Sequence, residues 1–190
     1  PHPEVDTGLH ILLVVDYAAA QNYPLTVRFA ALTHDLGKAA TPKEHWPTHH
    51  GHEHKSVDLV ERLCERLRVP GECRDLAVLA ARYHGDVHRA HELRPLTVLK
   101  LLSAADVYRK PDRFEELLAA CSCDYRGRSG LETRPYPQAD LLREVAAAAR
   151  AVDAGGIAQR VNGDPGRIRA AIEAARLEAV SRTLSELRQR

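Results

Sequence analysis

Apolar residues recur at helical spacing through most of this chain, and this periodicity limits what the chain can fold into. The clearest case is residues 52–67, where one stripe of apolar side chains, three or four positions apart, comprises Val57, Val60, Leu63, Cys64 and Leu67. No stretch of useful length alternates apolar and polar residues as a strand does. Ala and Leu dominate the apolar residues, which favours helices over sheets. We therefore predict an all-α fold.

Breaks in this pattern divide the chain into consecutive predicted helices. Asn22-Tyr23-Pro24 and Pro70-Gly71 are typical turn sequences. Gly37 and Gly85 are each expected to end a helix, because glycine commonly follows the last helical residue. The predicted helices are Thr7 to the break at Asn22, Thr26 to Gly37, His52 to Leu67, Gly71 to Gly85, Val98 to Lys110, Pro111 to Asp124, Ala139 to Ala154 and Arg167 to Gln189.

The chain has 190 residues, 44% of them hydrophobic, which suffices for one core or for one domain with an appendage. The two predicted helices of the tail contain no histidine, whereas the part before them contains all 11. We therefore predict a helical domain over residues 1–125 and a C-terminal helical extension over 126–190. The absence of Met and the linker-like opening Pro1-His2-Pro3-Glu4 are expected of a piece of a longer protein.

The cysteines and the apolar runs indicate the cellular compartment expected for this protein. Cys64, Cys73, Cys121 and Cys123 include no Cys-x-x-Cys pair, so we expect reduced thiols in a cytoplasmic protein. No apolar run approaches the roughly 20 residues needed to span a bilayer, so no membrane association is expected. The formal net charge of +1 gives no general attraction to nucleic acid, and any basic surface must be local.

An adjacent imidazole and carboxylate, His34 and Asp35, lie in the apolar stretch Ala31-Leu32-Thr33-His34-Asp35-Leu36-Gly37-Lys38. Such a pair is hard to satisfy inside a core unless a cation lies between the two groups. Both groups are also good ligands for a divalent metal. His10 and Asp106 come from two other predicted helices, and helical bundles build metal sites from facing helices in this way. We predict a divalent metal held by His10, His34, Asp35 and Asp106.

Three other residues are candidates for the same site. His52 and His84, each beside a glycine, could hold a second metal or a substrate phosphate; otherwise they are hydrogen-bonded histidines at helix boundaries. Lys38 could bind a phosphate oxygen, or could simply be a cation near a helix C-terminus. His10 by itself could be a core histidine bonded to a carbonyl, and Asp106 an exposed helix carboxylate.

The order of these residues resembles the signature of the HD-domain metal-dependent phosphohydrolases. Longer runs resemble, more closely, the HD domain of bacterial CCA-adding tRNA nucleotidyltransferases, over about residues 1–130. These runs are Pro3 to His10, Arg28 to Lys38, His50-Gly51-His52-Glu53, Arg82-Tyr83-His84-Gly85, His91 to Pro95 and Arg109 to Phe114. The resemblance implies an HD-domain helical bundle that follows an N-terminal nucleotidyltransferase domain in the complete enzyme.

The resemblance also implies an activity. The HD part of that family adds 2′,3′-cyclic phosphodiesterase, 2′-nucleotidase and phosphatase activities, with Ni²⁺ or Mg²⁺; Mn²⁺ suits the same ligands. The implied catalytic residues are His34, Asp35, His52, His84 and Lys38. The implied substrates are the tRNA 3′ end and small 2′,3′-cyclic or 2′-phosphorylated nucleotides. The chain has no Gly-Ser followed by Asp-x-Asp, so by itself it is not expected to polymerise nucleotides.

Two other functions stay open on the sequence. One is an HD-type nucleotidase or cyclic-nucleotide phosphodiesterase unrelated to tRNA. The other is a helical module that positions tRNA or mediates formation of a homodimer, without turnover. The basic residues Arg109, Lys110, Arg113, Arg126 and Arg128 fit contact with a tRNA backbone, or equally a solvated charged face.

Overall fold

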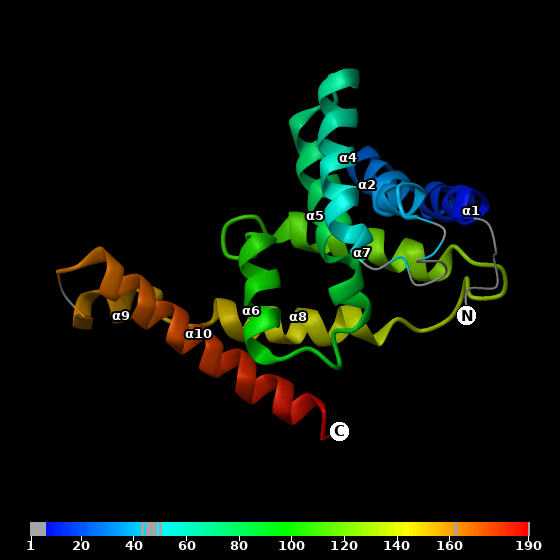
Figure 1. Cartoon of the computed structure of the whole chain (residues 1–190). Helices are drawn as coiled ribbons and strands as arrows, with labels where there is room; N and C mark the ends of the chain where they lie inside the picture. The colour runs from blue at the N-terminus through cyan, green and yellow to red at the C-terminus, as the bar shows by residue number, and fades with distance from the viewer. Residues whose placement is uncertain (1–6, 43, 45–48, 50, 162, 190) are drawn as a thin grey trace.

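The structure is a computed structural model that describes residues 7–42, 44, 49, 51–161 and 163–189. Its regular secondary structure in these residues is helical without exception, which confirms the predicted all-α fold (Figure 1). The helices are α1 (Thr7–Ala20), α2 (Leu25–Thr33), α3 (Leu36–Ala39), α4 (His52–Leu67), α5 (Gly71–His88), α6 (Pro95–Ala104), α7 (Pro111–Arg126), α8 (Pro137–Arg150), α9 (Ala154–Val161) and α10 (Pro165–Leu187).

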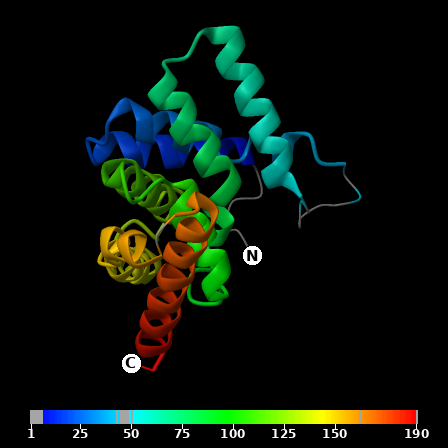
Figure 2. The same ribbon diagram turned by 90° about the vertical axis from the view of Figure 1, so that its left-hand side faces the viewer.

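Helix α5 is the centre of the arrangement. It packs against α2, α4 and α7, and it also contacts α6 and α8. The long helices α4 and α5 lie side by side, and the C-terminal end of α10 lies at the opposite end of the molecule (Figure 1, Figure 2). Helix α10 packs against α6, α8 and α9. None of the helices within the described ranges is long and apolar enough to cross a membrane.

One hydrophobic cluster joins α1, α2, α5, α6, α7, α8 and α10. Its fully buried members include Val14 of α1, Leu76 of α5, Leu118 of α7, Leu142 of α8 and Leu184 of α10. A second, smaller cluster between α4 and α5 consists of Val60, Cys64, Ala77 and Ala81. The main cluster draws on both sides of residue 125, and the division into domain and extension at that position stays a prediction. The four cysteines are buried and free.

The predicted ends of α5 and α6 were wrong. Helix α5 continues past Gly85 to His88, because burial of His84 and Val87 outweighs the roughly 1 kcal/mol that an internal glycine costs. Helix α6 ends at Ala104, six residues before the predicted end at Lys110. Asp106 adopts a left-handed backbone conformation, with φ of 55°. The Asp106 N–H donates to the Ser103 carbonyl and the Val107 N–H to the Leu102 carbonyl, which together form a Schellman motif that closes the helix.

The structure also corrects the prediction for Gly37 and adds a helix. Helix α2 ends at Thr33, and Gly37 lies inside the short helix α3 instead of ending a helix. Glycine is required there because α3 passes very close to α4: a Cβ on Gly37 would overlap the carbonyl oxygen of His52 and lie 2.6 Å from the Ser56 nitrogen. Helix α9 was not predicted, since Gly155 and Gly156 hide its periodicity.

Candidate metal centre

The predicted pair His34 and Asp35 occupies the bend between α2 and α3. Both residues are almost completely buried, at 2% and 3% exposure. His34 follows the last residue of α2, and its Nδ1 lies 2.8 Å from the carbonyl oxygen of Ala31. Asp35 precedes α3, and its Oδ2 lies 3.3 Å from His34 Nε2 and 2.6 Å from Lys38 Nζ. Lys38 therefore balances part of the charge of a buried carboxylate.

Three histidines share one tautomer. The Nδ1 atoms of His34, His52 and His84 lie 2.8, 3.0 and 3.0 Å from the carbonyl oxygens of Ala31, His49 and Ala80. A carbonyl oxygen only accepts hydrogen bonds, so each Nδ1 carries the proton. In the neutral ring the Nε2 atom then has an unshared electron pair. Metal-binding histidines are typically held in this way, with the other ring nitrogen donating to a carbonyl or carboxylate.

The three Nε2 atoms converge on the carboxylate of Asp35. His52 Nε2 and His84 Nε2 lie 3.2 and 3.4 Å from Asp35 Oδ1, and 3.5 Å from each other. His34 Nε2 and Asp35 Oδ1 make no hydrogen bond of acceptable geometry, although both are buried. Neutral imidazole nitrogens facing a carboxylate repel it unless protons or a cation lie between them. This donor set fits a divalent metal.

A second buried carboxylate, that of Asp124 in the last turn of α7, completes the cluster. Its Oδ1 lies 2.9 Å from His10 Nε2 and 3.6 Å from His34 Nε2. Its Oδ2 lies 2.6 Å from His88 Nε2, and Arg128 Nη2 lies 3.3 Å from Oδ1. Asp124 was not predicted as a ligand from the sequence. Its signal was its position seven residues after the buried Leu117, which places a carboxylate on the apolar face of α7.

The structure does not bring Asp106 to this cluster. Its carboxylate is bound to the exposed Arg109, with Nε and Nη2 each 2.9 Å from one of its oxygens. The reason is the early end of α6, which leaves Asp106 in the closing turn beyond the helix. Among the described residues, the groups whose ligand atoms lie within 4.8 Å of one another are His10, His34 and Asp124, and His34, Asp35 and His84. His34 belongs to both.

The charges of the cluster stabilise one another. Burial by itself would raise the pKa of Asp35 and of Asp124, but His34 and the other histidines around each carboxylate together outweigh it, and both pKa values lie well below the usual range. Burial would lower the pKa of His34, but Asp35 and Asp124 hold it well above its usual value. The pKa of His52 is raised by Asp35 in the same way. Without a metal the cluster therefore retains protons, which a bound metal would displace.

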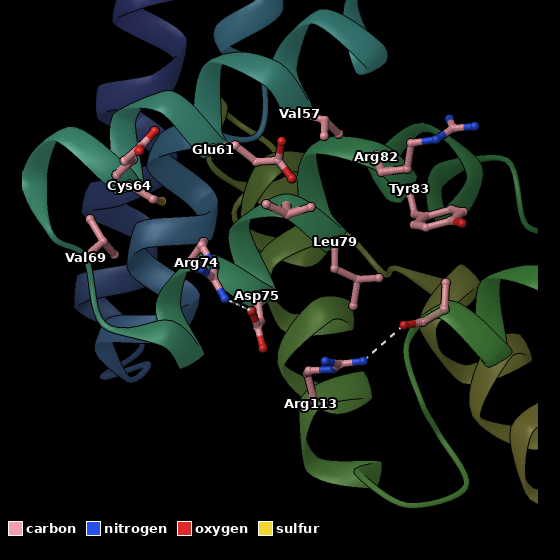
Figure 3. Close-up of a pocket in the computed structure, with 13 residues that line it drawn as sticks. Val57, Glu61, Cys64, Val69, Arg74, Asp75, Leu79, Arg82, Tyr83 and Arg113 are labelled. Carbon is pink, nitrogen blue, oxygen red and sulfur yellow. Dashed lines mark hydrogen bonds and ion pairs between the residues drawn. The ribbon is translucent and has the colours of Figure 1, made fainter.

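A cavity of about 800 Å³ lies on the opposite faces of α4 and α5 from the histidines. Three of its charged side chains have partners: Figure 3 shows Arg74 paired with Asp75, and Arg113 donates to the carbonyl oxygen of Ala104. None of the residues of the buried cluster lines this cavity. The candidate metal centre is therefore a separate feature of the molecule.

The basic residues suggested for tRNA contact are largely engaged within the chain. Arg109 binds Asp106, Arg113 binds the carbonyls of Ala104 and Ala105, and Arg126 donates to the Arg134 carbonyl. Arg128 binds Asp124. Their contact with tRNA stays a prediction.

Comparisons with known proteins agree with the resemblance seen in the sequence. The HD domain family model matches residues 7–110. The chain is 60% identical, over its whole length, to 46% of a multifunctional CCA protein of Nitrosospira multiformis. It is 58% identical, over 96% of its length, to 44% of multifunctional CCA proteins of Burkholderia pseudomallei and Burkholderia mallei. The chain thus spans less than half the length of these relatives. The comparison with solved structures finds no match.

Proposed function

This chain belongs to the HD domain family, and we propose that it is a metal-dependent phosphohydrolase whose metal is held by His10, His34, Asp35 and Asp124. The observation that carries the proposal is the convergence of three fixed Nε2 atoms on one buried carboxylate. Two of the atoms at that point, His34 Nε2 and Asp35 Oδ1, are buried without a hydrogen bond. Native proteins rarely leave such groups unsatisfied, and a metal would satisfy both.

The donor set favours particular metals. Imidazole nitrogens together with two carboxylates suit Ni²⁺ and Mn²⁺, whereas Mg²⁺ prefers oxygen ligands alone. A divalent metal bound here would polarise a phosphoryl oxygen and lower the pKa of a water molecule that attacks phosphorus. His34 would hold a central place, since it belongs to both groups of closely spaced ligand atoms.

The remaining residues would handle the substrate. The side chain of His52 is 14% exposed, so its Nε2 can reach a bound phosphate while it faces the cluster. Its raised pKa keeps a proton available on Nε2, which it could give to the leaving ribose oxygen. His84 Nε2, which has an unshared electron pair when the ring is neutral, would instead bind a second metal or accept a hydrogen bond from the attacking water. Lys38, 16% exposed, would hold Asp35 in place and contact a phosphate oxygen.

The proposed substrates are 2′,3′-cyclic phosphates and 2′-phosphates of nucleotides and of the tRNA 3′ end. The support is the long shared motifs and the high identity to proteins named multifunctional CCA protein. In a complete protein of that kind the domain would act in maturation and repair of tRNA 3′ ends in the cytoplasm. A phosphorus atom bound to the 2′ oxygen is common to all these substrates, so one site can process them.

A pair of matched variants tests the proposal. The metal-stripped chain is refilled with Ni²⁺, Mn²⁺ or Mg²⁺, and hydrolysis of 2′,3′-cyclic AMP and 2′-AMP is measured, with 3′-AMP as a comparison. Asp124→Asn should lower kcat/KM about 100-fold, the upper end of what loss of a residue supporting a metal ligand costs, because Asp124 is itself a proposed ligand. Asp106→Asn should leave it nearly unchanged, and asparagine tolerates the left-handed backbone of that position.

Two results would contradict the proposal in different ways. Loss of activity in Asp106→Asn but not in Asp124→Asn would show that the ligand assignment is wrong. If the folded, metal-loaded wild-type chain hydrolyses none of the substrates, the proposed phosphohydrolase activity is wrong. That result would favour a module that positions tRNA or forms dimers.

A further inference from the structure

His88 lies one turn beyond His84 on α5 and connects the metal centre to the segment that follows α7. Its Nε2 lies 2.6 Å from Asp124 Oδ2, and its Nδ1 lies 2.8 Å from the hydroxyl oxygen of Tyr136. An ionised carboxylate only accepts hydrogen bonds, so Nε2 carries the proton. In the neutral ring Nδ1 is then an acceptor, and the Tyr136 hydroxyl donates to it. The hydrogen bonds therefore run in one direction, from Tyr136 through His88 to Asp124.

The surroundings of Tyr136 keep its hydroxyl group protonated and fixed in place as a hydrogen-bond donor. The residue is 5% exposed and lies immediately before the first residue of α8, Pro137. Burial, with Cys121, Asp124 and Tyr125 adding to it, raises the pKa of the Tyr136 hydroxyl, so the group keeps its proton. Gln138 Nε2 donates to the backbone carbonyl of His88 at 3.2 Å. The start of α8 thus holds both the side chain and the backbone of His88.

We infer that Tyr136 is a positioning residue of the metal centre: acting through His88, it holds Asp124 so that Oδ1 faces His10 and His34. This inference rests on the proposed function, because it takes Asp124 as a metal ligand. Tyr136 lies outside the 7–110 match to the HD domain. The segment after α7 therefore contributes to the metal centre in addition to packing against the core.

Removal of the Tyr136 hydroxyl has a defined consequence. In Tyr136→Phe the Nδ1 atom of His88 loses its hydrogen-bond donor, so the ring is held only by its Nε2 contact and no longer fixes the position of Asp124 Oδ2. The carboxylate can then rotate away from His10 and His34. Loss of a group that orients a metal ligand typically weakens metal affinity about 10–100-fold, and we expect the lower end here because His88 itself remains.

The first measurement is Ni²⁺ affinity by isothermal titration calorimetry on the full, metal-stripped chain. Tyr136→Phe should bind Ni²⁺ about tenfold more weakly than wild type. Tyr125→Phe is the matched control, since its ring lies 5.1 Å from that of Tyr136 and its hydroxyl is not in the hydrogen-bond path to Asp124; its affinity should not change. If Tyr136 acts only through His88, adding Tyr136→Phe to His88→Ala should weaken binding no further than His88→Ala alone.

The second measurement is the His88 tautomer in the wild-type chain, read from long-range ¹H–¹⁵N correlations of its ring; the Nε2–H form is expected. A Nδ1–H form would overturn the inference even if a variant failed to fold. Unchanged Ni²⁺ affinity in Tyr136→Phe, or independent effects in the double variant, would also overturn it. A wild-type chain that binds no Ni²⁺, Mn²⁺ or Mg²⁺ would instead contradict the proposed function, and with it the premise of this inference.

Discussion

Replacement of Gly37 by alanine should damage both the stability and the activity of this protein. A Cβ at this position would lie 2.6 Å from the backbone nitrogen of Ser56 and 2.7 Å from its Oγ. Ordinary contact begins near 3.4 Å, and the carbonyl oxygen of His52 would be closer still, so α3 and α4 would have to separate by at least about 0.8 Å. The atoms on the α4 side include backbone atoms, which cannot rotate out of the way.

The magnitude follows from three contributions. Overpacking of this kind costs about 1–3 kcal/mol, and the upper half applies because the clash involves backbone. The Gly37 N–H donates to Ser56 Oγ at 2.8 Å, and loss of that hydrogen bond costs about 1 kcal/mol more. Alanine regains about 0.5–1 kcal/mol through helix propensity. The free energy of unfolding should therefore fall by about 2–3.5 kcal/mol.

The same movement should change the metal centre. Asp35 precedes α3 and His52 begins α4, and their facing atoms lie 3.2 Å apart. A displacement of about 1 Å among catalytic groups can cost about 100-fold in rate, so kcat should fall about 10–100-fold.

Urea denaturation followed by far-UV circular dichroism measures the stability, and hydrolysis of 2′,3′-cyclic AMP measures the activity. Gly71→Ala is the control, because a Cβ at that exposed position, in the first turn of α5, meets nothing within 4 Å. It should leave both quantities unchanged or raise the stability slightly. If Gly37→Ala matches wild type in the free energy of unfolding and in kcat, the close approach of α3 and α4 does not constrain this position as argued.

Two further predictions concern pH and thiol chemistry. The lowered pKa values of Asp35 and Asp124 stabilise the fold above their unfolded values near 3.9, and the raised pKa values of His34 and His52 do so below about 6.5. Urea denaturation of the metal-free chain should therefore show highest stability between about pH 4 and 6.5, falling on both sides; a rise through neutral pH would contradict this. Burial, with Asp124 adding to it, raises the pKa of Cys123 to about 12, and the other three cysteines are also buried. Ellman's reagent should thus label no cysteine in the native chain at neutral pH and all of them in urea, whereas rapid native labelling would show that a thiol is accessible.

The helices were predictable where the periodicity is strong. The stretch from His52 to Leu67 was predicted with both of its ends, since apolar residues recur there without a break and Pro70-Gly71 follows. Pro111 as the start of α7 was equally clear. The ends of α5 and α6 were not predictable. Glycine usually follows the end of a helix, but Gly85 lies inside α5, and the left-handed residue that closes α6 is an aspartate instead of the usual glycine.

Some residues of the metal centre were likewise predictable from the sequence and others were not. The structure brings together five of the predicted site histidines and carboxylates, which are His10, His34, Asp35, His52 and His84. Spacing placed Asp124 on the apolar face of α7, but it assigned no role to Asp124, His88 or Tyr136. Those roles depend on contacts between residues 36, 48 and 114 positions apart. Lys38 was a candidate on sequence, and the structure pairs it with Asp35.

The sequence alone determined the helical class of this protein and the local chemistry at His34-Asp35, since both depend only on neighbours within a few turns of chain. Tertiary structure decided which second carboxylate joins the cluster. Each helical residue turns the next side chain by about 100° about the helix axis. Because α6 ends early, Asp106 lies outside the helix and its side chain does not point toward the histidine cluster. The packing of α7 against α1, α2 and α5 directs Asp124 toward the histidines instead. Such convergence depends on how distant helices pack, which no local pattern records.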